Sequence, residues 1–265
     1  MKRIGILDVN VVTEKLVRGL FLAIPDVQLF ISPGFSETAQ ALASEFPCWT
    51  MDTNQGVIDE AEIIIINSAA DELKNLAETI QLKNHHTIVS LIPGIQTRTL
   101  CEQFKHPRCI RLMITNAVEI NKSAVFITAA SDETLELFSM LGQLIVFTRE
   151  SDFNIAAVSL CMNSWLYFLA DGFQSWFIQN GISEGLARNM VLAGMKDCVE
   201  YASNKDSTSL NDLWQTVNFF RDTAHQGIAV LAQQHALAPW KAASDKVLNE
   251  IETFHFTQNQ GFEDS

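Results

Sequence analysis

The first half of the chain alternates short apolar runs with apolar residues at helical spacing. An apolar run at residues 3–8 is followed by a helical pattern over residues 16–21, and a second run lies at residues 27–32. The next helical pattern begins after Ser36, a residue type that caps helix N-termini. Ile63–Ile66 is a continuous β-branched run, typical of a parallel strand that helices cover on both faces. Further strands are expected at residues 87–91, 109–114, 124–128 and 144–148. This alternation predicts an α/β fold with a doubly wound, mainly parallel sheet.

The second half of the chain has a different pattern, which begins near Glu150. From there onward we find no convincing alternation but several long helical patterns. The first of them, residues 153–179, is apolar on more than one face, which fits either a membrane span or a helix buried among several neighbours. Polar residues such as Asn163 within it favour the buried helix. We therefore expect an α/β domain at residues 1–150 and an all-helical domain at residues 151–265.

The composition narrows the classes of partner. The formal net charge is −13 and the pI is about 4.8, so the surface repels phosphate backbones and anionic lipid headgroups. We therefore expect neither a nucleic-acid partner nor a membrane partner. No run reaches roughly 18 uninterrupted apolar residues, and the Met-Lys-Arg start leads into a β-like run instead of a signal-peptide core. These features predict a cytoplasmic protein.

The cysteines and histidines do not indicate a metal site. The five cysteines include no CxxC pair, so neither a disulfide framework nor a zinc site is expected. His85 and His86 are adjacent, so on a strand they point to opposite sides and cannot bind one metal together. We expect both histidines at the surface, just before a strand.

Local sequence strings and the order of the elements together resemble a known family. The strings are MKRIGILDVNVVTEKLVRGL (residues 1–20), VSLIPGI (89–95), IRLM (110–113), Met140 to Gly142, Glu150, Gly181-Ile182, Ala187 and VNFFRDTAHQGI (217–228). Over nearly the whole chain this set is similar to the pyrroline-5-carboxylate reductase family. The resemblance implies a Rossmann-like N-terminal domain that binds NAD(P). It also implies a helical domain that joins two subunits into a homodimer and contributes to the substrate site.

The resemblance places the cofactor-binding positions in the first β-α turn and after a later strand, at Leu7, Asp8, Val9, Asn10, Val11 and Ser68. Asp8 and Asn10 stand where the family has glycines, which let the backbone turn sharply and approach the pyrophosphate. A carboxylate about 4 Å from a phosphate charge repels it by a few kcal/mol at an intermediate dielectric. An NADP enzyme also offers Arg or Lys after the second strand, but residues 32–36 contain no basic side chain. We therefore expect neither NADP nor NAD in the usual pose. Asp8 and Asn10 instead suit a turn stabilised by side-chain to backbone hydrogen bonds.

The resemblance places one part of the substrate site on the long helix. The family's Gly-Ser-Gly-Pro-Ala string aligns with residues 160–164, which makes Asn163 and Ser164 candidate substrate-binding residues. Leu160 and Met162 replace two glycines there, and their side chains fill space that a close backbone approach needs.

A second part of the substrate site lies in a loop before a later helix. The family's Ser-Pro-Gly-Gly-Thr-Thr loop holds the imino-acid carboxylate and places a hydroxyl near the imine nitrogen, and it aligns with residues 219–224. Only Thr223 is kept, so it is the candidate catalytic residue and a candidate substrate-binding residue. Thr223 can instead cap the following helix together with Asp222. Arg221 can receive a substrate carboxylate in a charge-assisted fork, or it can face solvent.

These changes favour a protein that keeps the fold but not the chemistry. Several family strings have changed together, whereas the hydrophobic pattern has persisted. The first hypothesis is a non-catalytic or repurposed homodimer without a nicotinamide cofactor. It would bind a small molecule in the cleft between its domains, or a protein. The alternative is an active NADP- or NAD-dependent oxidoreductase that reduces a small cyclic imine such as pyrroline-5-carboxylate.

Overall fold

The computed structural model describes residues 2–215 and 221–263, and it describes side chains for residues 2–215 and 222–253. The family-like string at residues 217–228 therefore lies partly outside the described residues.

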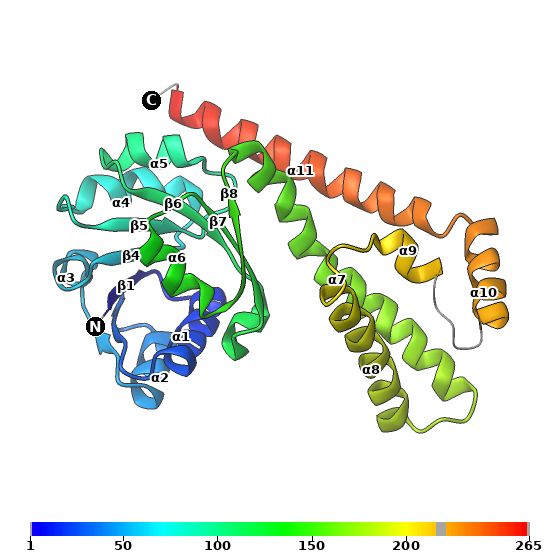
Figure 1. The fold of residues 1–265 in the computed structure, drawn as a ribbon. Helices are drawn as coiled ribbons and strands as arrows, with labels where there is room; N and C mark the ends of the chain where they lie inside the picture. Colours follow the sequence, from blue (N-terminus) through cyan, green and yellow to red (C-terminus); the bar gives the residue numbers. More distant parts are fainter. Residues whose placement is uncertain (1, 216–220, 264–265) are drawn as a thin grey trace. The chain divides into compact units, whose positions relative to one another are not determined.

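The first part of the chain is built on one sheet (Figure 1). Its strands are β1 (Arg3–Leu7), β2 (Gln28–Ser32), β3 (Trp49–Thr50), β4 (Ile63–Ile66), β5 (Thr87–Ser90), β6 (Cys109–Met113), β7 (Ser123–Thr128) and β8 (Gly142–Phe147). They lie in the order β3-β2-β1-β4-β5-β6-β7-β8. Neighbouring strands are parallel except β6 and β7, which are antiparallel. The expected doubly wound, mainly parallel sheet is confirmed.

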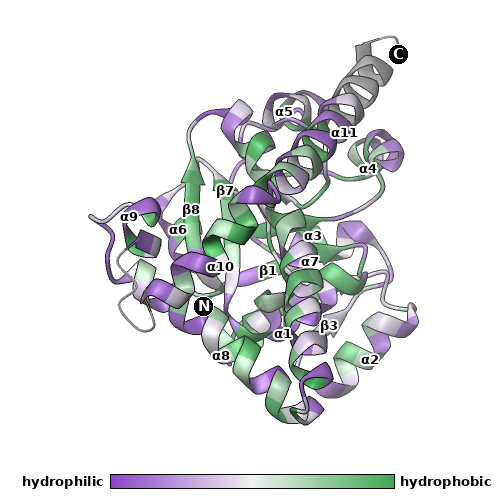
Figure 2. Ribbon diagram, turned by 90° about the vertical axis from the view of Figure 1, so that its right-hand side faces the viewer, coloured by the Kyte–Doolittle hydropathy of each residue, from purple (hydrophilic) through white to green (hydrophobic). Residues whose placement is uncertain are grey.

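Helices cover both faces of this sheet (Figure 1). One face carries α1 (Val11–Ala23), α2 (Glu37–Glu45), α6 (Asp132–Ser139) and the 3-10 helix η2 (Asn116–Ile120), and the other carries α3 (Asn54–Glu60), η1 (Ala70–Glu72), α4 (Leu73–Thr79) and α5 (Thr97–Phe104). The β-branched residues of β4 contribute to the hydrophobic core on both faces of the sheet. Ile63 and Ile65 belong to the first core and Ile64 and Ile66 to the second, and all four are buried. Figure 2 shows the hydrophobic character of β7 and β8 as well.

The second part of the chain is helical. Its helices are α7 (Glu150–Gln179), α8 (Glu184–Ser203), α9 (Leu210–Gln215), α10 (Arg221–Gln233) and α11 (Leu237–Glu263). Contacts within the chain define two compact units, which are Met1–Leu160 with Leu248–Ser265, and Cys161–Val247. This division falls inside α7, ten residues after the boundary expected at residue 150. The reason is that the first turns of α7 pack with the sheet: the ring centroids of Phe153 and Phe147 lie 5.8 Å apart.

Of two local predictions, the helix cap at Ser36 is confirmed and the surface position of His86 is not. Ser36 caps α2 as predicted, because its Oγ accepts the Ala39 N–H at 3.2 Å. The expectation that His86 lies at the surface was wrong, since its side chain is 0% exposed. Its Nδ1 accepts the Lys83 N–H at 3.1 Å, and its carbonyl accepts a hydrogen bond from His106 Nε2 at 2.7 Å. Tertiary packing thus buries a residue whose neighbour, His85, stays exposed.

Candidate functional site

The turn between β1 and α1 contains the family's nucleotide-binding positions. Leu7 is fully buried at the end of β1, and Asp8 follows it with a φ of 63°, in the left-handed region. Asp is among the few non-glycine residues that enter this region readily. The Asp8 N–H donates to the Ser32 carbonyl at 3.0 Å, which holds the turn against the end of β2. Asp8 therefore adopts a backbone conformation that glycine favours, and it adds a carboxylate to it.

Asn10 caps the N-terminus of α1. Its Oδ1 accepts the N–H groups of Val12 and Thr13 at 3.0 and 3.3 Å. In return, Thr13 Oγ1 accepts the Asn10 N–H at 2.7 Å, which completes a capping box. The expected turn with side-chain to backbone hydrogen bonds is therefore present. Two N–H groups at this helix end are already bonded within the chain.

Asn67 supports this cap from the neighbouring strand. Because β1 and β4 pair in parallel, with Leu7 beside Ile66, the residues that follow the two strands come together. Asn67 Nδ2 donates to Asn10 Oδ1 at 2.9 Å, and Asn10 Nδ2 donates to the Asn67 carbonyl at 3.4 Å. Asn10 Oδ1 thus accepts hydrogen bonds from two backbone groups and from the side chains of Asn67 and Thr13. It occupies the position at a helix N-terminus where an anion's oxygen is otherwise held.

The Asp8 carboxylate is half-buried beside Ser68. Burial raises the pKa of Asp8, the negative charge of Glu72 raises it further, and the Ser68 hydroxyl lowers it. Neither of these two neighbours is positively charged, and only the hydrogen bond from the Ser68 hydroxyl stabilises the ionised form of Asp8. The sequence resemblance brought Asp8, Asn10 and Ser68 together as cofactor positions, and the structure places them around one turn. Asn67 and Glu72 complete this group, which we call the β1-α1 turn cluster.

The candidate substrate residues on α7 lie in the second unit. Asn163 and Ser164 are both exposed, and Ser164 Oγ donates to the Cys161 carbonyl one turn earlier at 2.8 Å. Leu160 and Met162, which stand where the family has glycines, are partly exposed and exposed, respectively. These positions therefore present side chains along one exposed stretch of α7.

The candidate residues of the later loop fall at the start of α10. Arg221 is the first residue of α10, and its side chain lies outside the described residues. Thr223 is exposed and lies two residues inside the helix, next to the exposed Asp222. Because the helix begins at Arg221, Thr223 belongs to the first turn and is not the capping residue that the alternative interpretation required.

A buried charge cluster beside the start of α7 was missed by the sequence interpretation. The Arg111 side chain on β6 is 4% exposed, and its Nη1 donates to Glu150 Oε1 at 2.5 Å and to Asn154 Oδ1 at 2.8 Å. The guanidinium lies 4.6 Å from the centre of the Phe153 ring. Burial lowers the pKa of Arg111, whereas the hydrogen bond and charge of Glu150 raise it. The available signal was an Arg inside an apolar strand, because a buried Arg needs a partner.

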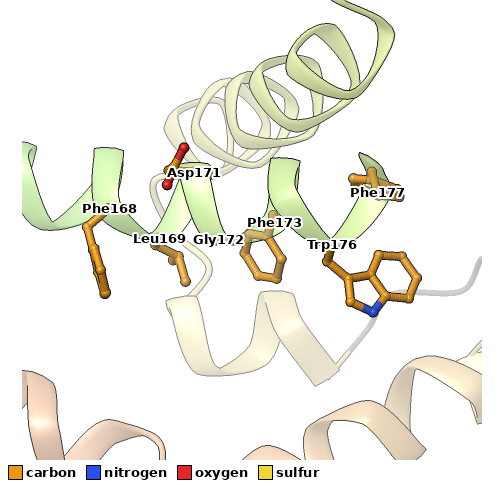
Figure 3. Close-up of a pocket in the computed structure, with 7 residues that line it drawn as sticks. All are labelled: Phe168, Leu169, Asp171, Gly172, Phe173, Trp176 and Phe177. Atoms are coloured by element: carbon orange, nitrogen blue, oxygen red, sulfur yellow. The ribbon is translucent and has the colours of Figure 1, made fainter. Parts of the chain in front are cut away.

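Helix α7 also carries an exposed apolar face. Figure 3 shows Phe168, Leu169, Phe173 and Trp176 pointing to one side of the helix, whereas Asp171 points to the other. Phe168 is 80% exposed and Trp176 is 57% exposed. Exposed aromatic side chains in one group on a protein surface mark an interaction site. We call these four residues the α7 apolar face.

The sheet followed by a helical part defines the class of fold, which is that of the pyrroline-5-carboxylate reductases. By length and composition α7 could cross a membrane, but in this fold it is a helix of the helical part and not a membrane span.

Three solved reductases illustrate the likeness. The enzyme from Streptococcus pyogenes has a TM-score of 0.80 at 19% identity, covering 94% of this chain and 98% of that chain. The enzyme from Coxiella burnetii has a TM-score of 0.81 at 15% identity, with 96% and 98% covered. The enzyme from Plasmodium falciparum, solved with NADP bound, has a TM-score of 0.79 at 16% identity, again with 96% and 98% covered. No family model matches the chain, and no curated protein matches it.

Proposed function

We propose that this chain forms a cytoplasmic homodimer that has the pyrroline-5-carboxylate reductase fold, lacks its nicotinamide chemistry and binds a different ligand. The observation that carries the proposal is the β1-α1 turn cluster. In a dinucleotide-binding turn, the pyrophosphate accepts hydrogen bonds from backbone N–H groups at the helix N-terminus. Here the N–H groups of Val12 and Thr13 already donate to Asn10 Oδ1.

NAD(P) does not fit this turn in the usual pose. A phosphate would have to displace the Asn10 side chain from two backbone groups and from Asn67. It would also approach the half-buried Asp8 carboxylate. Burial and the charge of Glu72 already raise the pKa of this group. Nearby basic groups on α1 are engaged elsewhere, since Lys15 pairs with Glu119 at 2.7 Å and Arg18 pairs with Glu14 at 3.1 Å. We therefore assign no hydride-transfer step to this chain.

The proposed dimer rests on the α7 apolar face. Exposure of a large aromatic side chain such as Phe168 to water costs free energy, and burial against a partner surface removes this cost. The family resemblance implies that this partner is a second copy of the chain, joined through the helical part. In that dimer the face would become an interface core, which is typically rich in aromatic residues.

A second candidate function is reduction of a small cyclic imine with NADPH or NADH. The likeness over at least 94% of this chain to reductases, one of them solved with NADP bound, favours it. We place it second because fold alone does not fix function, and the turn that would hold the nucleotide is closed by its own side chains.

A variant that reopens the turn tests the proposal. We expect Asp8→Gly combined with Asn10→Gly to lower the NADPH dissociation constant at least about tenfold, because it removes the carboxylate and frees two backbone N–H groups. Glycine keeps the φ of 63° at position 8 accessible and costs only a few tenths of a kcal/mol as an N-cap. The measurement is a titration followed by nicotinamide fluorescence.

The matched control removes the same two side-chain types from exposed turns, in Asp26→Gly combined with Asn84→Gly. It should bind NADPH no better than the wild type. If the wild type already binds as tightly as the reopened variant, the turn is not closed and the proposal fails.

A further inference from the structure

The helices of the second unit bury little apolar surface among themselves. Of the described residues in Cys161–Val247, only Ala187 and Val191 are buried. Large side chains such as Phe168 and Trp176 are instead more than half exposed. A surface that gathers exposed hydrophobic groups in this way is one that another surface covers. The apolar side chains of this unit therefore require a cover from outside it.

Gly172 lies in the interior of α7, among the residues of the α7 apolar face (Figure 3). Apart from its own helix, no atom of the described residues lies within 4 Å of the place where a Cβ would stand on Gly172. Glycines of the sheet differ, because a Cβ at Gly5 would meet the Val57 side chain and one at Gly19 would meet the Val118 carbonyl. Glycine in a helix interior lowers stability relative to alanine. The contacts within the chain do not explain Gly172, whereas close approach of another helix does.

Large and small residues follow one another along this face at a spacing of four. Phe168, Gly172 and Trp176 form one row, because residues four apart lie on the same side of a helix. Packed helices commonly interdigitate such rows. This row has a gap at Gly172 with an aromatic side chain on either side, so a second helix can cross it there.

The space beside this row is open on the side away from α7. A hollow of about 680 Å³ lies along the α7 apolar face, and its described lining residues all belong to α7. None of the other described helices is among the elements that line it. A helix from outside the unit would therefore supply the opposite wall.

The row fits a second copy of itself. In a two-fold symmetric contact the same patch of both chains meets, so that patch has to be complementary to itself. An aromatic side chain at equal spacing before and after a gap meets this condition. A two-fold axis at Gly172 places Phe168 of one copy beside Trp176 of the other.

Charge also favours a second copy. Residues 161–247 contain eight acidic and six basic side chains, whereas the rest of the chain contains 23 and 12. Two copies of an acidic protein repel each other, and contact through the nearly neutral segment brings the least like charge together. Asp171 points away from the α7 apolar face (Figure 3), so a contact there buries no carboxylate of this residue.

We propose that α7 of one copy crosses α7 of a second copy at Gly172, with Phe168 of each copy packed beside Trp176 of the other. The inference rests on the proposed function, because it specifies how the proposed homodimer is joined. The two backbones approach closely at Gly172, where a side chain would hold them apart.

Substitution of Gly172 tests the crossing. Gly172→Leu inserts a side chain between the two helices, so we expect the dimer dissociation constant to rise at least about tenfold, as measured by analytical ultracentrifugation. Gly172→Ala should raise it by a smaller factor. If water covers the face instead, both changes should raise the melting temperature and leave association unchanged, because alanine and leucine favour a helix over glycine.

The matched control is Gly185→Leu, which makes the same change in the exposed first turn of α8, where a Cβ also meets open space. It should leave the dissociation constant unchanged. Association of Gly172→Leu that equals or exceeds that of the wild type would overturn the proposal.

Photo-cross-linking identifies the helix that covers the face. Phe168→p-benzoylphenylalanine keeps an aromatic side chain at an exposed position. Isotope-labelled and unlabelled full-length copies of this variant are mixed, allowed to exchange subunits and irradiated. We expect cross-linked peptides that join a labelled to an unlabelled copy, both from α7. Cross-links that reach only other helices of the second copy would overturn the crossing, as would the absence of cross-links between copies.

The outcomes separate this inference from the proposed function. A dimer whose cross-links avoid α7 overturns the crossing alone and leaves the proposed homodimer intact. A wild type that is monomeric at every concentration contradicts both. Saturable NADPH binding contradicts the proposed loss of nicotinamide chemistry, whatever the helices do.

Discussion

The β1-α1 turn cluster and the α7 apolar face differ in whether their groups are bonded within the chain or exposed. At the turn, helix N–H groups that could hold an anion are bonded to Asn10, and Asn67 supports that side chain. On α7, aromatic side chains such as Phe168 and Trp176 remain largely exposed. In the first region the N–H groups at the helix end donate to a side chain of the same chain. In the second region the apolar side chains remain exposed.

This difference separates two properties of the reductase fold. The proposed assembly depends on apolar surface, which the exposed face of α7 would supply. Cofactor binding depends on free backbone donors and on the absence of negative charge, and under the proposed function Asn10 and Asp8 have replaced both. A protein can therefore retain the architecture of an enzyme while the residues that bind the cofactor change, because the two depend on different positions.

The largest expected effect is on assembly. Phe173→Glu places a carboxylate in the centre of the α7 apolar face, where burial without a partner costs several kcal/mol. We expect the molar mass from light scattering to fall from about twice to about once the 29.6 kDa of the chain. The control Ser207→Glu adds the same charge at an exposed turn and should leave the dimer intact. A wild type that is monomeric, or a Phe173→Glu variant that stays dimeric, would contradict the proposal that the α7 apolar face forms the dimer interface.

The next effect concerns the interior of the first unit. Glu150→Gln removes the charged partner of the buried Arg111, and we expect a loss of roughly 2–3 kcal/mol in the free energy of unfolding. Asp152→Asn is the matched control two residues away, because its partner Arg149 has a side chain that is 75% exposed. It should cost less than about 1 kcal/mol. Urea denaturation measures both, and equal losses would show that burial of the pair contributes nothing.

Buried His86 predicts a loss of stability in acid. The pKa of His86 is lowered from 6.5 to about 4, mainly by burial, with smaller contributions from His85, Lys83 and His106 and an opposing one from Asp59. The folded state therefore binds fewer protons than the unfolded state between these values. Its stability is full above pH 6.5 and falls as the pH drops from 6.5 towards 4.

We expect this group to contribute a loss of roughly 1–3 kcal/mol over that range. His86→Asn keeps an acceptor for the Lys83 N–H but does not titrate, so its pH dependence should be flatter than that of the wild type. His85→Asn, at the exposed neighbour, should follow the wild type. The free energy of unfolding at several pH values measures the difference, and identical slopes for all three proteins would contradict the assignment.

The smallest effect concerns the conformation of Asp8. Asp8→Gly relieves a left-handed backbone conformation and removes a half-buried carboxylate, and it should stabilise the protein by about 0.5–1.5 kcal/mol. Lys105→Gly is the matched control, since Lys105 also has a positive φ, of 47°, but is exposed. It should gain only the conformational part. A gain at position 8 no larger than that at position 105 would mean that the carboxylate carries no penalty in the free protein.

The fold could be predicted from the sequence further than the site could. The β-branched run of β4 and the cap at Ser36 follow from local rules that the structure obeys. The burial of His86 and the pairing of Arg111 with Glu150 depend on contacts between segments far apart in the chain. Hydrophobic periodicity does not report such contacts, so these features could not be predicted.

The candidate site could be predicted only where its contacts join residues close together in the sequence. The side chains of Asp8 and Asn10 belong to one turn, and residue types alone indicated how that turn is stabilised. The bond from Asn67 to Asn10 required the pairing of β1 with β4. Thr223 was expected as a catalytic residue from the family resemblance, and it lies in the first turn of α10. The role of the substrate positions on α7 and α10 stays a prediction.

The central claim is that the β1-α1 turn cluster excludes the nicotinamide nucleotide, and a titration of the wild type with NADPH and with NADH tests it most directly. Nicotinamide fluorescence and thermal stability are followed together, because a ligand at 100 times its dissociation constant stabilises the fold by about 2.7 kcal/mol. We predict no saturable fluorescence change and no rise in melting temperature at millimolar nucleotide. Saturable binding in the micromolar range, with a matching rise in melting temperature, would contradict the account and favour an active imine reductase.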